Sequence, residues 1–189
     1  MCGVVLISLA ATAYMAVAFN RRAKADLADA LTPLAAAIDG NVDIDDASVQ
    51  GWYAGRIVGG RVANATDGPG RVFRTEVVDA AGGVAWQYLW DPARRHSELP
   101  NQRFESVNGE LAALLKPECD RRLAAVANPG RDRFRLDYDP ETGRLRFERA
   151  MRTRKEIPDD ATFRQQLDLL VAIGQANRRA QGAPDADMA

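Results

Sequence analysis

The segment RFRLDYDPETGRLRFER (133–149) alternates apolar and charged residues on both sides of a central turn sequence. Its apolar side chains stand at every second position before and after the turn: Phe134, Leu136, Tyr138, Leu145 and Phe147. Alternation with this period is the pattern of a strand with one buried face and one solvated face. The turn, DPETG (139–143), supplies turn-forming residues and ends in glycine, which readily takes a left-handed backbone conformation. The segment therefore predicts a half-buried hairpin in an antiparallel sheet.

The composition is that of an ordinary globular chain. Of the 189 residues, 47% are hydrophobic and 27% are charged, and the formal net charge is −1. This length suits one domain of roughly 100–150 residues with additional segments. A near-neutral chain lacks the strongly basic surface of a nucleic-acid-binding domain, so we expect no nucleic-acid partner. Arginine greatly outnumbers lysine, and alanine and glycine are abundant, which is typical of GC-rich bacterial genes.

A run of uncharged residues, 2–19, opens the chain. As a helix it would span about 27 Å, close to the roughly 30 Å hydrocarbon core of a bilayer. Arg21, Arg22 and Lys24 follow it and could reach the lipid headgroups. The pattern favours a transmembrane anchor over 1–20, ahead of a cleaved signal peptide and of a buried core helix.

The charges beside this run also predict an orientation. Basic residues that flank a membrane span stay in the cytoplasm, and here they all follow the span. We therefore expect a single-pass protein of the inner membrane whose folded domain lies in the cytoplasm. Ser8, Thr12 and Ala16 recur every four residues, a spacing of small residues that favours self-association of membrane helices.

A juxtamembrane amphipathic helix is predicted for 21–40, followed by an α+β domain over 41–181 and a disordered tail over 182–189. The apolar face of that helix carries Leu27, Leu31, Leu34 and Ile38. Pro33 within it predicts a kink or a break.

Further turns are predicted at paired glycines. Gly59–Gly60 indicates a hairpin, and AAGG (80–83) indicates a second hairpin between strands at 71–79 and 84–90. A helix is predicted within 103–126, interrupted at Pro117.

The C-terminal helix is predicted to begin at a cap formed by Asp160 or Thr162. The predicted order is α-β-β-β-β-α-β-β-α. This is an α+β fold in which a transmembrane helix precedes an antiparallel sheet of about five to six strands with helices on one face. The order of elements resembles that of type III secretion chaperones and related small bacterial α+β proteins. The resemblance implies a protein that binds rather than catalyses.

No pattern of residues indicates catalysis. His96, the single histidine, lies in a polar loop without a nucleophile motif, and turn chemistry explains Asp137, Asp139 and Glu141. Cys119 lies between two acidic residues, which raise the pKa of a thiol and disfavour the reactive thiolate. With one histidine and two cysteines, a His/Cys zinc site is not expected. We therefore predict no enzyme activity, no catalytic residue, no metal and no cofactor.

The segment ERAMRTRKE (148–156) holds the candidate interaction patch: Arg149, Arg152, Arg154 and Lys155. These side chains could contact anionic lipid headgroups or an acidic segment of a partner, or they could simply face water. Aromatic residues of neighbouring predicted strands are more typical of a core than of a binding surface: Trp52, Tyr53, Trp86, Tyr88 and Trp90.

These observations support two hypotheses about function. The first is a non-catalytic, membrane-anchored domain that binds a protein partner or assembles at the membrane. The alternative is a sensor or carrier domain, possibly exported, that binds a small ligand in a cleft between sheet and helices. A concave apolar pocket with a few polar groups would favour the alternative, and a flat aromatic or arginine-rich face would favour the first.

Overall fold

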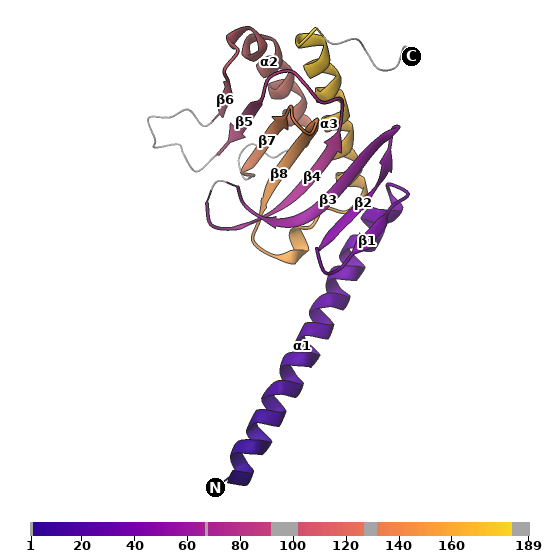
Figure 1. Ribbon diagram of the computed structural model, residues 1–189, viewed down its shortest axis with the longest axis vertical. Helices are drawn as coiled ribbons and strands as arrows, with labels where there is room; N and C mark the ends of the chain where they lie inside the picture. The colour runs from indigo at the N-terminus through magenta and orange to yellow at the C-terminus, as the bar shows by residue number, and fades with distance from the viewer. Residues whose placement is uncertain (1, 67, 92–101, 127–131, 183–189) are drawn as a thin grey trace.

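Eight strands form one antiparallel sheet in the computed structural model, which describes residues 2–66, 68–91, 102–126 and 132–182 (Figure 1). The strands are β1 (Asn41–Asp43), β2 (Ser48–Tyr53), β3 (Arg56–Asn64), β4 (Arg71–Val78), β5 (Trp86–Trp90), β6 (Gln102–Ser106), β7 (Phe134–Asp139) and β8 (Arg144–Met151). The helices are α1 (Cys2–Ala36), α2 (Gly109–Val126), the short 3-10 helix η2 (Arg154–Glu156) and α3 (Asp160–Ala180). The predicted α+β class and antiparallel sheet are confirmed, whereas the predicted number of strands is too small.

The strand order is β1-β2-β3-β4-β8-β7-β5-β6. The hairpin predicted for 133–149 is confirmed, since β7 and β8 pair with Leu136 opposite Phe147 and Tyr138 opposite Leu145. This hairpin is inserted between β4 and β5, which are consecutive in the chain.

The second predicted hairpin, between 71–79 and 84–90, is therefore wrong, because β4 and β5 do not pair. The segment that joins them instead packs against the turn of the β7–β8 hairpin. The Gly82 amide donates to the Pro140 carbonyl at 2.7 Å, and the Asp79 amide donates to the Gly143 carbonyl at 2.8 Å.

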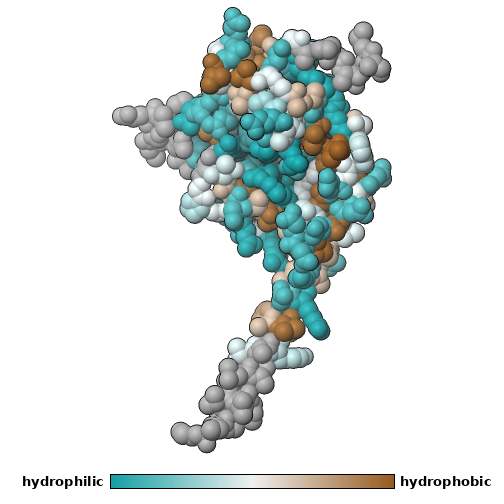
Figure 2. All heavy atoms as spheres, viewed as in Figure 1, coloured by the Kyte–Doolittle hydropathy of each residue, from teal (hydrophilic) through white to brown (hydrophobic). Residues whose placement is uncertain are grey.

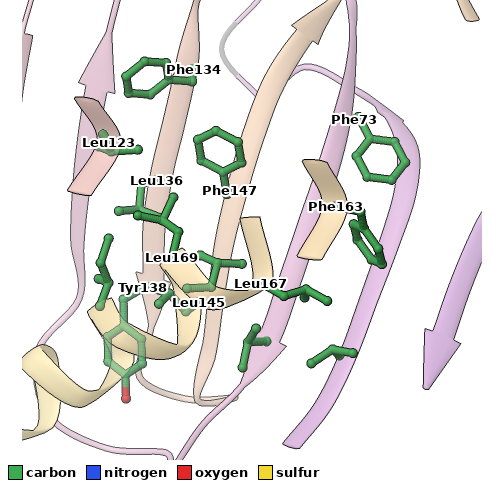
Figure 3. Close-up of a cluster of buried hydrophobic side chains, with 14 of the residues drawn as sticks. Phe73, Leu123, Phe134, Leu136, Tyr138, Leu145, Phe147, Phe163, Leu167 and Leu169 are labelled. Carbon is green, nitrogen blue, oxygen red and sulfur yellow. The ribbon is translucent and has the colours of Figure 1, made fainter. Parts of the chain in front are cut away.

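One face of the sheet packs against the helices, and the other is open. On β4, Phe73 meets Phe163 of α3 edge to face, with 6.0 Å between the ring centres. Thr75 donates a 2.6 Å hydrogen bond to Gln166 of the same helix. Figure 3 shows this core, in which side chains from β4, β7, β8 and α3 interdigitate. Since side chains alternate along a strand, Arg74 lies on the open face.

The helix predicted within 103–126 begins only at Gly109, because 102–106 form β6. Pro117 does not interrupt it: α2 continues through the proline, whose side chain is exposed. One buried stripe continues in phase on both sides of Pro117, and it comprises Leu111, Leu115, Cys119 and Leu123. Packing of this stripe outweighs the lost backbone hydrogen bond.

The predicted helix 21–40 is confirmed only as far as Ala36, and it is continuous with the apolar stretch before it in one helix, α1. Its predicted apolar face is confirmed, and all of its members are buried: Leu27, Leu31, Leu34 and Ile38. Pro33 is exposed, and the helix passes through it without a break. Two contacts hold α1 at the edge of the core. Lys24 lies 2.7 Å from Asp45, and Arg154 donates to the Ala23 carbonyl at 2.9 Å.

The predicted transmembrane anchor over 1–20 is wrong. Within the described part of the chain, no helix is both long enough and apolar enough to cross a membrane. The inner-membrane localisation, the single-pass topology and the cytoplasmic placement of the domain rested on that anchor and are corrected with it.

The hairpin predicted at Gly59–Gly60 is displaced. Both glycines lie inside β3, and the two-residue turn between β2 and β3 is Ala54–Gly55. Both turn residues have positive φ, 47° at Ala54 and 72° at Gly55, as a two-residue hairpin turn requires. Gly60 has a different role: a Cβ there would lie 2.8 Å from Cζ of Phe73, so the glycine allows close packing in the core.

Candidate functional site

Charged side chains on the open face are arranged in rows that run across the strands. The register places one residue from each of six adjacent strands in the first row, which we call the arginine row: Arg103, Leu89, Arg135, Glu148, Arg74 and Arg61. Because neighbouring strands lie about 4.8 Å apart, each side chain can contact the next. Figure 2 shows that hydrophilic residues dominate the visible face of the domain.

The adjacent row on one side, which we call the acidic row, comprises Glu105, Gln87, Asp137, Arg146 and Glu76. Asp137 joins the two rows, since it accepts hydrogen bonds from Arg135 at 3.2 Å and from Arg146 at 3.3 Å. Glu105 forms an ion pair with Arg103 of the arginine row. Burial raises the pKa of Asp137, although the two arginines beside it act in the opposite direction. The acidic row thus holds guanidinium groups of the arginine row in place.

On its other side, the arginine row borders small apolar side chains: Ala63, Val72 and Ala150. The loop between β3 and β4 crosses this region, because the Thr66 hydroxyl donates to Glu148 on β8 at 3.0 Å. Val72 is only 5% exposed although it lies on the open face, as expected if the loop covers it. The open face therefore changes from acidic through basic to apolar along the strands.

A pocket of about 430 Å³ lies between the loop and the strands, which we call the open-face pocket. Its charged lining residues are Arg71, Arg103, Arg133, Arg135, Asp91 and Glu148. Its principal apolar lining residues are Val72, Leu89, Trp90, Phe134, Ala150 and Met151. The volume is within the range of small-molecule sites. A smaller hollow of about 200 Å³ lies over β2, β3 and β4 and includes Arg61 and Arg144.

Glu148 fixes one wall of the open-face pocket. It is 4% exposed, and one of its carboxylate oxygens accepts hydrogen bonds from Thr66 and from two nitrogens of Arg74, at 2.7 and 2.5 Å. The positive charge of Arg74 balances the carboxylate, so Glu148 links the β3–β4 loop to the sheet. Among the described residues, the lining includes no serine, cysteine or histidine. Its arginines and apolar side chains are suited to binding charged and apolar groups.

No group of three or more metal-ligating side chains comes together within the described ranges. Cys119 is fully buried on α2, and burial followed by the nearby Asp120 and Glu118 raises its pKa to about 12. His96 lies outside the described residues. Asp139 accepts from the Glu141 amide and the Thr142 hydroxyl in the β7–β8 turn, as the turn interpretation predicts.

The predicted interaction patch does not converge on one free surface. Arg149 donates to the Glu156 carbonyl at 2.8 Å, and Arg154 binds the Ala23 carbonyl of α1. Both side chains therefore hold parts of the fold together. Arg152, just before η2, and Lys155, within η2, are exposed. None of the four lines the open-face pocket.

The aromatic residues of the strands lie on either the helix-facing side or the open face of the sheet, according to their position along each strand. Trp86 and Tyr88 are buried on the helix-facing side, whereas Trp52 is 59% exposed on the open face. Trp90 contributes both to the aromatic cluster and to the pocket, since it stacks with Phe134 and lines the open-face pocket. Sequence reasoning did not identify the pocket residues, because the arginine row is brought together by strands distant in the chain.

Comparison with protein families, with curated proteins and with solved structures found no match to this chain. The resemblance to type III secretion chaperones gains no support from these comparisons, and the order on which it rested differs, since six strands rather than four precede α2. The fold and the site together define an α+β domain with an open, ion-paired sheet face that carries the open-face pocket. The open-face pocket is therefore the basis for a functional assignment.

Proposed function

We propose that this chain is a non-catalytic domain that binds a small ligand in the open-face pocket. The observation that carries the proposal is the pocket of about 430 Å³, in which apolar side chains lie beside several arginines. Concave sites with an apolar lining and a few orienting polar groups are the usual form of small-molecule sites.

A protein partner was the first hypothesis from the sequence, and the geometry supports the small ligand better. Ion pairs between neighbouring strands occupy much of the open face, including Arg74 with Glu148 and Arg144 with Glu76. Desolvating such pairs against a flat partner costs free energy that a small ligand in one pocket does not incur. The exposed apolar residues of this face, Trp52 and Ile57, form only a small pair on β2 and β3.

Protein-observed NMR with a fragment set of acids, bases and neutral compounds tests the proposal. We expect shifts of backbone amide signals to cluster at β4, β5, β7 and β8, around Leu89 and Ala150. Ala150 is exposed, so Ala150→Leu should fill the pocket without disturbing the core, and it should abolish these shifts.

The matched control is Ala124→Leu, at an exposed position of α2 away from the pocket. It should leave fragment binding unchanged. Shifts that cluster elsewhere, or that persist undiminished in Ala150→Leu, would refute the assignment of the pocket as the binding site.

A further inference from the structure

We propose that the ligand of the open-face pocket is an amphipathic anion, with a carboxylate or phosphate group at one end and an apolar chain or ring at the other. The inference rests on the proposed ligand-binding function and specifies its ligand class. It follows from the transition along the open face from the acidic row, through the arginine row, to the apolar side chains beneath the β3–β4 loop.

The charge of the lining favours an anion. Of the residues that the structure describes, four arginines line the pocket against two carboxylates, a formal excess of two positive charges. Of these carboxylates, Glu148 already accepts hydrogen bonds from Arg74 and Thr66. The carboxylate of Asp91 lies 3.6 Å from the guanidinium group of Arg133. A cationic ligand would meet repulsion from the arginines, whereas an anion would relieve the repulsion among them.

The register defines where the anionic group would bind. Leu89 on β5 lies directly between Arg103 on β6 and Arg135 on β7. Both arginine side chains are partly exposed, 33% and 19%, so a ligand can reach them. Glu105 and Asp137 hold these guanidinium groups from the acidic row. A guanidinium carries five donors in a planar fork, which suits the bidentate binding of a carboxylate or phosphate oxygen pair.

The apolar lining defines where the rest of the ligand would lie. Val72 and Ala150 are neighbours on β4 and β8, one row beyond the arginines, and Met151 follows on the same strand. Val72 and Met151 are already buried, whereas Ala150 is exposed and Leu89 and Trp90 are partly exposed. A bare inorganic anion would leave Ala150, Leu89 and Trp90 in contact with water. A ligand with an apolar end would cover them, at a gain of roughly 25 cal/mol per Å² removed from water.

Titration calorimetry of the full chain with four probes of equal chain length tests the ligand class: octanoate, octyl phosphate, octanol and octylamine. We expect the two acids to bind at least about tenfold more tightly than octanol, and octylamine to bind most weakly. Whichever of octanoate and octyl phosphate binds more tightly identifies the preferred head group. Inorganic phosphate, which lacks the apolar end, should bind more weakly than octyl phosphate.

Variants of the arginine row test the position of the head group. Arg103→Gln and Arg135→Gln should each weaken octanoate binding about tenfold and leave octanol binding unchanged. Arg144→Gln is the matched control, because Arg144 lies on the same face outside this pocket and pairs with Glu76. If Arg135→Gln fails to fold, Arg135→Lys serves instead. It keeps the charge, removes the planar fork and should cause a smaller loss.

Two results would overturn the inference. Octanol binding as tightly as octanoate would show that the arginines do not recognise an anion, and it would leave the pocket as a binding site. Failure of all four probes, with fragments of another class still binding at Leu89 and Ala150, would likewise reject the ligand class but not the proposed function. Failure of every fragment at the pocket would reject the proposed function itself.

Discussion

The ring of Phe163 on α3 occupies the space that a side chain at position 60 of β3 would need. A Cβ on Gly60 would lie 3.0 Å from Cε2 of Phe163 and 2.8 Å from Cζ of Phe73. Both rings are buried and meet edge to face, so neither can move without disturbing the core (Figure 3). Close approach of α3 to the sheet therefore depends on glycine at this position.

Gly60→Ala should lower the free energy of unfolding by about 1–3 kcal/mol, because overpacking a filled core forces side chains or backbone to shift. Urea denaturation followed by circular dichroism measures this change. Gly109→Ala is the control, since a Cβ at Gly109 meets no atom within 4 Å, and its stability should be unchanged or slightly higher. Equal stability of Gly60→Ala and the wild type would contradict the packing role.

The β2–β3 turn offers the opposite case, a non-glycine residue in a left-handed conformation. Ala54 has φ of 47°, which is unfavourable for an alanine and well tolerated by asparagine. Ala54→Asn should therefore raise the free energy of unfolding by about 0.5–1 kcal/mol. Ala54→Val, which is β-branched, should lower it. Thermal melts of the three proteins should rank Asn above Ala above Val, and any other ranking would contradict the turn assignment.

These glycines and turns show which parts of the fold could be predicted from sequence. The hairpin at 133–149 was predictable because its alternation and its turn residues are both local signals. The role of Gly60 could not be predicted, because the sequence does not distinguish a glycine needed for positive φ from one needed for close packing. Only the position of Phe163, more than a hundred residues later, distinguishes them.

The open-face pocket was still less accessible to prediction. Arg103, Leu89 and Arg135 come from three strands, and their alignment depends on the insertion of β7 and β8 between β4 and β5. No local pattern specifies that insertion, because strands joined by a short segment usually pair with each other. The basic cluster that is contiguous in sequence, by contrast, is partly used to hold η2 and α1 in place.

Cys119 should be unreactive in the folded protein. It is fully buried, and its pKa of about 12 leaves almost no thiolate at neutral pH. In a Cys2→Ser background, we expect iodoacetamide to label it at least about 100-fold more slowly than the exposed reference thiol of Ala124→Cys, because labelling requires opening of the fold. Labelling in urea should remove the difference. Rapid labelling of the native protein would contradict the burial of this side chain.

Asp137 and Asp139, two residues apart on β7, should affect stability with opposite dependence on pH. Burial raises the pKa of Asp137 above its ordinary value of 3.8, so the folded state binds this proton more tightly than the unfolded state does. Stability from this group is therefore present at low pH and is lost as pH rises from about 3.8 through the higher folded pKa. The hydrogen bond from Thr142 lowers the pKa of Asp139, which stabilises the fold above pH 3.8 and loses that effect as pH falls.

Urea denaturation of the wild type, Asp137→Asn and Asp139→Asn at several pH values between 3 and 7 tests this pair of signs. Relative to the wild type, Asp137→Asn should become more stable as pH rises, because the wild type must then ionise a buried carboxyl group between Arg135 and Arg146. Asp139→Asn should become less stable relative to the wild type over the same range. Each difference from the wild type is read by its sign, because Arg146 pairs with both carboxyl groups. The same trend in both variants would mean that burial does not dominate the ionisation of Asp137, and that the arginine row neutralises it fully.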